Sequence, residues 1–153
     1  MRSKKDQKLS GDVDFSEPKQ VLQRALQAMP KDQHVNIISK FGMLEFKSGQ
    51  PESGRTMFEG IVSNYPKRMD IWAIYMDMEA KYGQGNVTQA RHLFERCLSS
   101  EHIQKKPKKM KLVFQKYMEF ESKHGNKGNL ADLRKRVEEY LSKAFDGSAE
   151  NSS

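Results

Sequence analysis

Apolar residues recur along this chain in pairs of stripes, each with the spacing of one face of an α-helix. The clearest pair lies between Ile71 and Leu98. Its first stripe has large apolar residues at i, i+4, i+7 and i+11, namely Ile71, Tyr75, Met78 and Tyr82. A turn signal follows at residues 83–86, and a second stripe extends from Val87, with Asn86 as the expected N-cap. This pattern predicts a helical hairpin.

The same hairpin occurs again on both sides of this segment. Residues 38–45 match residues 72–79 at an offset of 34, which lies in the range of helical repeats. A third copy has its first helix at residues 114–121 and its second at residues 133–138, and residues 22–26 echo a second helix that has no first helix before it. The positions that recur are aromatic residues, glutamates and arginines: Phe41, Glu45, Arg55, Phe58, Trp72, Tyr75, Glu79, Arg91, Phe94, Tyr117, Glu121 and Arg134.

Prolines separate the expected helices, and none of the five falls inside an apolar stripe. We therefore predict an all-α fold of about seven helices without strands, arranged as a right-handed α-solenoid of hairpins. We expect Asp70 to cap the central hairpin. The apolar stripe of the helix before it is expected to contain Val35, Ile38, Phe41 and Leu44, with Phe46 as a further candidate.

The repeat boundaries divide the chain into an ordered array and two polar ends. The expected segments are a flexible N-terminal segment (1–17), a half repeat (18–29), three repeats (31–64, 67–99 and 107–145) and a disordered tail (146–153). An apolar face on the half repeat has no partner helix before it, so self-association through this face is a further expectation.

The shared motif of these hairpins resembles the half-a-TPR (HAT) repeat, with an aromatic-rich first helix and an arginine, phenylalanine and glutamate on the second. Residues 37–68, 108–111 and 116–121 carry a more specific resemblance, to the C-terminal region of the ribosomal RNA processing protein five family, known in animals as programmed cell death protein eleven. This resemblance covers roughly residues 19–145. Gly54 departs from the HAT pattern, which prefers alanine there.

The resemblance implies a non-catalytic scaffold within a large nucleolar protein, in which S1-type RNA-binding domains precede the HAT array. It implies a role in ribosome biogenesis, in the small-subunit processome and the early pre-rRNA cleavages that lead to 18S rRNA, with a further role in large-subunit assembly. The implied partners are pre-ribosomal assembly proteins, together with pre-rRNA, in the nucleolus or nucleus. An alternative is a HAT scaffold of another RNA-processing complex, in mRNA 3′-end processing or splicing, which a stable symmetric dimer would favour.

The composition suits a thin helical array. Apolar residues make up 36% of the chain and charged residues 31%, as expected where much surface is exposed per residue. The net charge of +7 suits a partner with an acidic surface, nucleic acid included. The single cysteine, Cys97, excludes an internal disulfide and favours a reducing compartment. We find no signal peptide and no apolar run long enough for a membrane span.

The recurring charged residues are interpreted as structural, because an active site occurs once whereas a packing device occurs in every repeat. These residues are Glu45, Glu79, Glu121, Arg55, Arg91 and Arg134. The aromatic residues could stack on RNA bases, but their positions on the apolar stripes favour core packing, with Trp72 as the largest member.

No set of residues in the sequence indicates catalysis or cofactor binding. The four histidines are scattered, and no cysteine or histidine pair has the spacing of metal ligands. Gly83 and Gly85 lack the preceding strand and third glycine of a dinucleotide-binding loop. We therefore assign no catalytic residue, no metal ligand, no cofactor and no small-molecule substrate, and we expect the chain not to be an enzyme.

One charged cluster is a candidate binding site, for RNA or for a protein partner. It consists of Lys105, Lys106, Lys108, Lys109 and Lys111. Residues 101–143 contain twelve lysines and arginines against six acidic residues, which accounts for most of the net charge. Three interpretations stay open: a solvated loop, a patch that contacts RNA phosphates, and a nuclear-import signal. A direct RNA-binding module is thus the main alternative to the scaffold.

Overall fold

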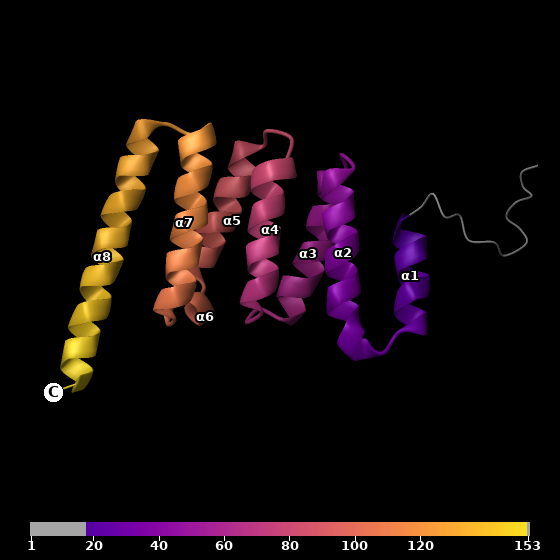
Figure 1. Ribbon diagram of the computed structural model, residues 1–153, viewed down its shortest axis with the longest axis horizontal. Coiled ribbons are helices and arrows are strands. Elements are labelled where there is room, and N and C mark those ends of the chain that lie inside the picture. The colour runs from indigo at the N-terminus through magenta and orange to yellow at the C-terminus, as the bar shows by residue number, and fades with distance from the viewer. Residues whose placement is uncertain (1–17, 153) are drawn as a thin grey trace, which may run out of the picture. The chain divides into compact units, whose positions relative to one another are not determined.

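The computed structural model describes residues 18–152, and every regular element within this range is a helix (Figure 1). The elements fall into two compact units that divide between Asn64 and Tyr65. The first unit contains α1 (Pro18–Ala28), the 3₁₀ turn η1 (Lys31–Gln33), α2 (His34–Lys47) and α3 (Pro51–Asn64). The second contains α4 (Met69–Tyr82), α5 (Val87–Ser99), α6 (Glu101–Gln104), α7 (Pro107–His124) and α8 (Lys127–Ser152).

The short helix α6 was not predicted, because its sequence was interpreted as a connection. Ser100 is extended before it, and Ile103 anchors the turn with only 1% of its surface exposed. Lys106 is also extended, as expected for the residue before a proline, so α6 cannot continue into α7. Within residues 18–152 there are therefore eight α-helices instead of the seven predicted, and η1 is a further short turn.

Helices α2 and α3 of the first unit pack closely, and two glycines make this possible. A Cβ atom on Gly54 would lie 2.6 Å from the ring of Phe46 and 2.7 Å from the carbonyl oxygen of Gly42. Phe46 is only 1% exposed and contacts Phe58 across the helix pair, with ring centroids 6.1 Å apart. The departure from alanine at position 54 therefore has a packing reason.

The apolar stripe predicted for α2 is wrong at one position. Leu44 is 60% exposed, whereas Phe46 is buried and Ile38 and Phe41 are half-buried. Successive residues in a helix turn by about 100°, so positions 44 and 46 lie on nearly opposite sides and only one can face α3. The large ring of Phe46 takes that place, which leaves Leu44 toward solvent.

The end of α2 is a glycine cap. Gly49 has a φ of 89°, in the left-handed region that glycine adopts without steric cost. The backbone N–H of Gln50 donates to the carbonyl of Glu45 at 2.8 Å, which is the long hydrogen bond of a Schellman motif. Helix α2 therefore ends at Lys47, directly before this cap.

Aromatic residues form the core of the second unit. The ring of Phe94 on α5 stacks on that of Tyr117 on α7, with centroids 4.7 Å apart and an interplanar angle of 7°. Trp72 on α4 is 6% exposed, and its indole N–H donates to the carbonyl of Pro66 at 2.9 Å. These rings are therefore packed inside the unit and are not available to stack on RNA bases, which confirms the core interpretation for them.

Two predicted helix caps have different outcomes. The side chain of Asn86 accepts a hydrogen bond from the backbone N–H of Gln89 at 3.2 Å, so the predicted N-cap of α5 is confirmed. The N-cap position of α4 is Arg68, not Asp70 as predicted. Asp70 lies in the first turn, where its carboxylate accepts two hydrogen bonds from Arg68. Its negative charge also interacts favourably with the positive end of the helix dipole.

The last helix is longer than predicted. Helix α8 extends to Ser152, through most of the segment (146–153) for which disorder was expected, so that expectation is corrected. No proline occurs in this segment, and a single glycine costs a helix only about 1 kcal/mol. The expected flexible segment 1–17 lies outside the described residues.

None of the described helices is long and apolar enough to span a membrane. In the same residues, no group of three or more histidine, cysteine, aspartate and glutamate side chains is placed to hold a metal ion.

Candidate partner-binding surface

A buried glutamate near the end of the first helix is shared by all three repeats. Glu45, Glu79 and Glu121 are 8%, 3% and 2% exposed, and each is followed four residues later by a glycine. The environment of Glu121 is the best defined. Arg91 on α5 donates from Nε and Nη2 to the two carboxylate oxygens, at 2.7 and 2.9 Å, and Asn129 donates to one of them at 3.2 Å.

The surroundings of Glu121 explain both its burial and its charge. A Cβ atom on Gly125 would clash with the Glu121 carboxylate, so glycine is needed for the chain to turn beside it. The hydrogen bonds from Arg91, and secondarily from Asn129, hold the pKa of Glu121 below its usual value despite burial. Glu121 therefore links α5, α7 and α8 as a charged structural group.

A second ionic group in the same unit was not predicted. Arg136 on α8 donates to both oxygens of Glu95 on α5, at 2.8 and 2.9 Å, and the hydroxyl of Tyr117 donates to Glu95 at 2.8 Å. The guanidinium of Arg136 lowers the pKa of Glu95, while burial and the adjacent carboxylate raise the pKa of Tyr117. This group joins three helices.

The repeat pattern predicted Arg134 as the structural arginine of the last helix, but Arg136, two residues later, forms the ion pair with Glu95. Arg134 is exposed and forms no ion pair among residues 18–152, so its predicted structural role is not supported. Arg136 lies on the inner face of α8 with buried Leu133 and half-buried Tyr140. The spacing of these apolar residues was the sequence signal that could have identified Arg136.

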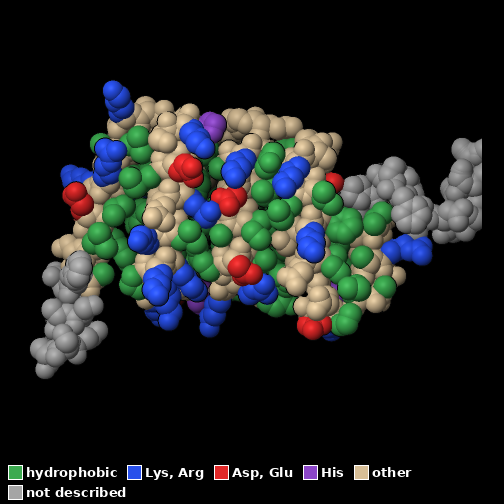
Figure 2. Space-filling view, in the orientation of Figure 1, with side chains coloured by type: hydrophobic (Ala, Val, Ile, Leu, Met, Phe, Trp, Pro, Cys, Tyr) green, Lys and Arg blue, Asp and Glu red, His purple; other side chains and the backbone are tan. Residues whose placement is uncertain are grey.

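The lysine cluster lies at the junction of α6 and α7. Lys105, Lys106, Lys108 and Lys111 are exposed and Lys109 is half-exposed. Figure 2 shows basic side chains gathered over the end of α7 that lies beside α6. The first turn of α7 contains no acidic residue, so the positive end of the helix dipole and the lysines act together. The structure therefore places all five predicted lysines around the start of α7.

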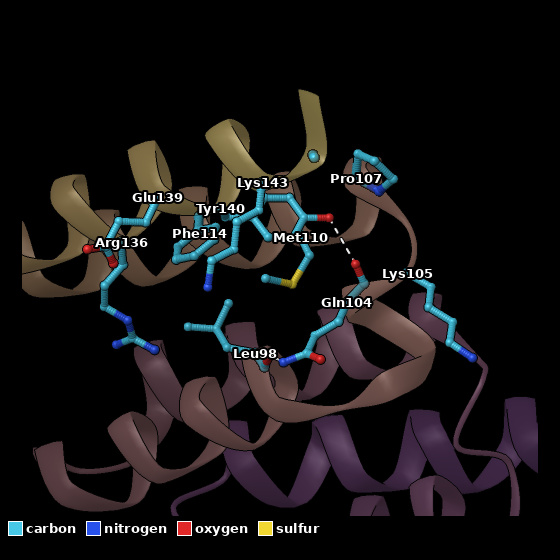
Figure 3. Close-up of a pocket in the computed structure, with 11 residues that line it drawn as sticks. Leu98, Gln104, Lys105, Pro107, Met110, Phe114, Arg136, Glu139, Tyr140 and Lys143 are labelled. Atoms are coloured by element: carbon cyan, nitrogen blue, oxygen red, sulfur yellow. Dashed lines mark hydrogen bonds between the residues drawn. The ribbon is translucent and has the colours of Figure 1, made fainter. Parts of the chain in front are cut away.

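A cleft opens next to this cluster. It has a volume of about 800 Å³ and lies between the α6–α7 junction and the second half of α8, where α8 diverges from α7 (Figure 1). Apolar residues from α5 and α7 line its inner side, and the rim includes Lys105, Arg136 and Lys143 (Figure 3). The hydroxyl of Tyr140 donates to the backbone carbonyl of Gln104 at 2.9 Å and closes one edge.

Comparison with known proteins identifies the chain's relatives. Residues 84–152 match the family described as Suppressor of forked protein (Suf). The rRNA biogenesis protein rrp5 of Schizosaccharomyces pombe is 43% identical over 124 residues, which is 81% of this chain. The chain belongs to the RRP5 family. The RRP5 homolog of Mus musculus and the RRP5 protein of Arabidopsis thaliana are each 40% identical, over 79% and 78% of the chain.

The match to the RRP5 proteins covers only a small part of each of them. The chain spans only 6–7% of the length of these three proteins, so it corresponds to one segment of much larger molecules. Together with the helices described above, the Suf match confirms the predicted all-α fold of HAT hairpins.

Proposed function

We propose that this chain is a non-catalytic scaffold segment that acts in ribosome biogenesis by holding assembly proteins of the pre-ribosome. The observation that carries the proposal is its 40–43% identity to RRP5 proteins of a fungus, an animal and a plant, which are named for rRNA biogenesis or after RRP5 itself. A helical repeat array is suited to this role because it presents a large surface for its number of residues.

The charged groups paired between helices support a scaffold more than an enzyme. A general acid or base needs a free proton site near substrate, with a pKa close to the working pH. Glu95 and Glu121 are instead held as carboxylates by bidentate arginines, with pKa values below their usual range. Their hydrogen bonds are directed to neighbouring helices, so their chemistry stabilises the array.

The finer form of the proposal follows the family. The chain acts in the nucleolus, within the small-subunit processome, and supports the early pre-rRNA cleavages that lead to 18S rRNA. The alternative of a HAT scaffold in mRNA 3′-end processing or splicing is less favoured, because the similar proteins named above belong to RRP5.

Direct RNA binding is a second candidate function, favoured by the position of the lysine cluster. Five lysines surround the first turn of α7, and the amide groups of a helix N-terminus attract phosphate. Phosphate contacts of this kind give affinity without sequence preference and weaken steeply with salt. In this function the repeats present the lysines to pre-rRNA.

Sedimentation of the native protein tests the scaffold. The protein with residues 18–152 deleted is compared with the unaltered protein in extracts of cells that express each, and their co-sedimentation with pre-ribosomal particles is measured. We expect the deletion to move the protein out of the particle fractions. Undiminished sedimentation with the particles would overturn the proposed function.

A further inference from the structure

The cleft beside α6 has the size and lining of a ligand site. Its volume of about 800 Å³ lies within the range of roughly 300–1,000 Å³ that is typical of binding pockets. Leu98, Met110 and Phe114 face it, and each is at most 6% exposed, so the inner wall is apolar and already packed in the fold. In Figure 3 the side chains of Met110 and Leu98 point toward one another.

Two hydrogen bonds hold the inner walls of the cleft in place. The amide nitrogen of Gln104 donates to the carbonyl of Leu98 at 2.8 Å, and the carbonyl of Gln104 accepts from Tyr140. The ring of Tyr140 also contacts that of Phe114, with centroids 6.3 Å apart. An occupant therefore meets a preformed apolar wall with few free donors or acceptors.

The rim of the cleft is basic. Lys105 and Lys143 are exposed, and neither forms an ion pair within the described part of the chain. Arg136 is neutralised by Glu95, so these two lysines face the single acidic residue of the lining, Glu139. The other lysines of the cluster lie next to Lys105 and strengthen the positive potential at this end.

These observations distinguish between a protein and a nucleic acid as the occupant. Recognition of bases requires hydrogen-bonding groups or exposed aromatic faces, and the side-chain nitrogen and backbone carbonyl of Gln104 are already engaged. An apolar side chain, in contrast, would be buried against Leu98 and Met110, while carboxylates beside it would meet the lysines.

We propose that the cleft between the α6–α7 junction and α8 is a docking site for an acidic protein segment that inserts a large apolar side chain. The inference rests on the proposed scaffold function, since it states the chemical class of segment that the scaffold holds. The apolar anchor supplies the binding energy, and Lys105 and Lys143 select for acidic residues on either side of it.

A random dodecapeptide library displayed on phage provides the probe, with the folded chain as target. We expect the selected peptides to combine phenylalanine, leucine or tryptophan with aspartate and glutamate. The double variant Lys105→Glu/Lys143→Glu should weaken their binding by roughly tenfold or more, since it removes two exposed charge pairs. The matched control, Lys81→Glu/Lys127→Glu, makes the same charge change at exposed lysines outside both the cleft and the lysine cluster and should leave binding within about twofold of the parent chain.

Nuclear magnetic resonance of the unaltered chain locates the peptide without any substitution. Backbone amide shifts should move at the start of α7 and in the second half of α8, while the indole N–H of Trp72 stays unchanged. Three results would each overturn the proposed docking site. These are selected peptides without enrichment in acidic and apolar residues, equal losses of binding in both double variants, and amide shift changes elsewhere in the chain. Displacement of the peptides from these amides by a uridine oligonucleotide that binds more tightly would also overturn it.

Peptide binding to the cleft and sedimentation of the deletion protein together separate the two proposals. If no peptide binds the cleft while deletion of residues 18–152 still removes the protein from pre-ribosomal particles, the docking proposal is overturned and the scaffold function is supported. If the deletion leaves sedimentation unchanged, the scaffold itself fails.

Discussion

Arg91 and Glu121 form a bidentate ion pair between α5 and α7, with nitrogen–oxygen distances of 2.7 and 2.9 Å. The carboxylate is 2% exposed, whereas the arginine side chain is 36% exposed. The pair is therefore open to solvent on one side only, and its loss would leave a buried charge without its main partner.

Replacement of Arg91 by methionine should destabilise the second unit by about 2 kcal/mol, less than the ~3–5 kcal/mol of a fully buried pair because Arg91 is partly exposed. The double variant Arg91→Met/Glu121→Leu should cost less than the sum of the two single variants, since it leaves no unpaired charge. Urea denaturation of the four proteins measures this coupling. Additive losses would show that the two residues act independently.

Acid should weaken the second unit through Glu95 and Glu121. Both have pKa values below the ordinary 4.5 in the folded chain, mainly because of their arginine partners. The unfolded state then binds protons first as the pH falls, so their stabilising contribution is complete above the unfolded pKa and is lost as the pH drops through the lower folded values.

The variant Glu121→Gln isolates one of these contributions. Its difference in stability from the unaltered chain should be largest near neutral pH and should shrink as the pH falls below about 4.5. Urea denaturation as a function of pH gives this difference directly. A difference that stays constant over the whole range would contradict the assigned pKa shift.

Two glycines of α3 should respond to alanine in opposite ways. Gly54→Ala places a methyl group against Phe46 and the carbonyl of Gly42 and should destabilise the first unit by about 1–3 kcal/mol. Gly60 has no neighbouring atom within 4 Å of the added Cβ, so Gly60→Ala should stabilise α3 by up to about 1 kcal/mol. Thermal melts of both variants test this; an equal effect of the two substitutions would refute the packing argument.

The errors of the sequence prediction came from positions that only packing decides. Periodicity identified the hairpins and the arginine and glutamate positions of the central repeat, because these recur in each copy. It placed Leu44 in the stripe of α2 and gave Phe46 only as a further candidate, since both are apolar and only the approach of α3 at Gly54 selects the ring. In the last helix, alignment to the repeat selected Arg134, whereas the inner face places Arg136 against Glu95.

The sequence located the lysine cluster but not the cleft beside it. The cleft depends on α6, a four-residue helix with too few residues to show periodicity, and on the long α8, whose second half was expected to be partly disordered. Residues from α5, α7 and α8 meet there only after the helices pack.

The lysine cluster should make only a minor contribution to RNA binding if the chain is chiefly a protein scaffold. Replacement of Lys105, Lys106, Lys108 and Lys109 by glutamate should leave the circular dichroism spectrum unchanged, because these side chains project to solvent at the end of α7. Binding of the unaltered chain to a single-stranded pre-rRNA fragment should be weak and should disappear at physiological salt.

A salt titration of this binding decides between the two candidate functions. Micromolar or tighter affinity that persists at physiological salt, with a log–log slope near −3 from about four to five phosphate contacts on a single strand, would favour the RNA-binding module. Loss of the fold in the four-lysine variant would instead show that these lysines are structural.

The processing of pre-rRNA in living cells tests the central claim most directly. Cells depleted of the native protein are supplied either with the unaltered protein or with the protein that lacks residues 18–152, and the precursors of 18S rRNA are measured on northern blots. The scaffold predicts that the deletion protein is expressed but that uncleaved precursors accumulate and mature 18S rRNA falls. Normal levels of 18S rRNA and of its precursors would contradict a role for this segment in ribosome biogenesis.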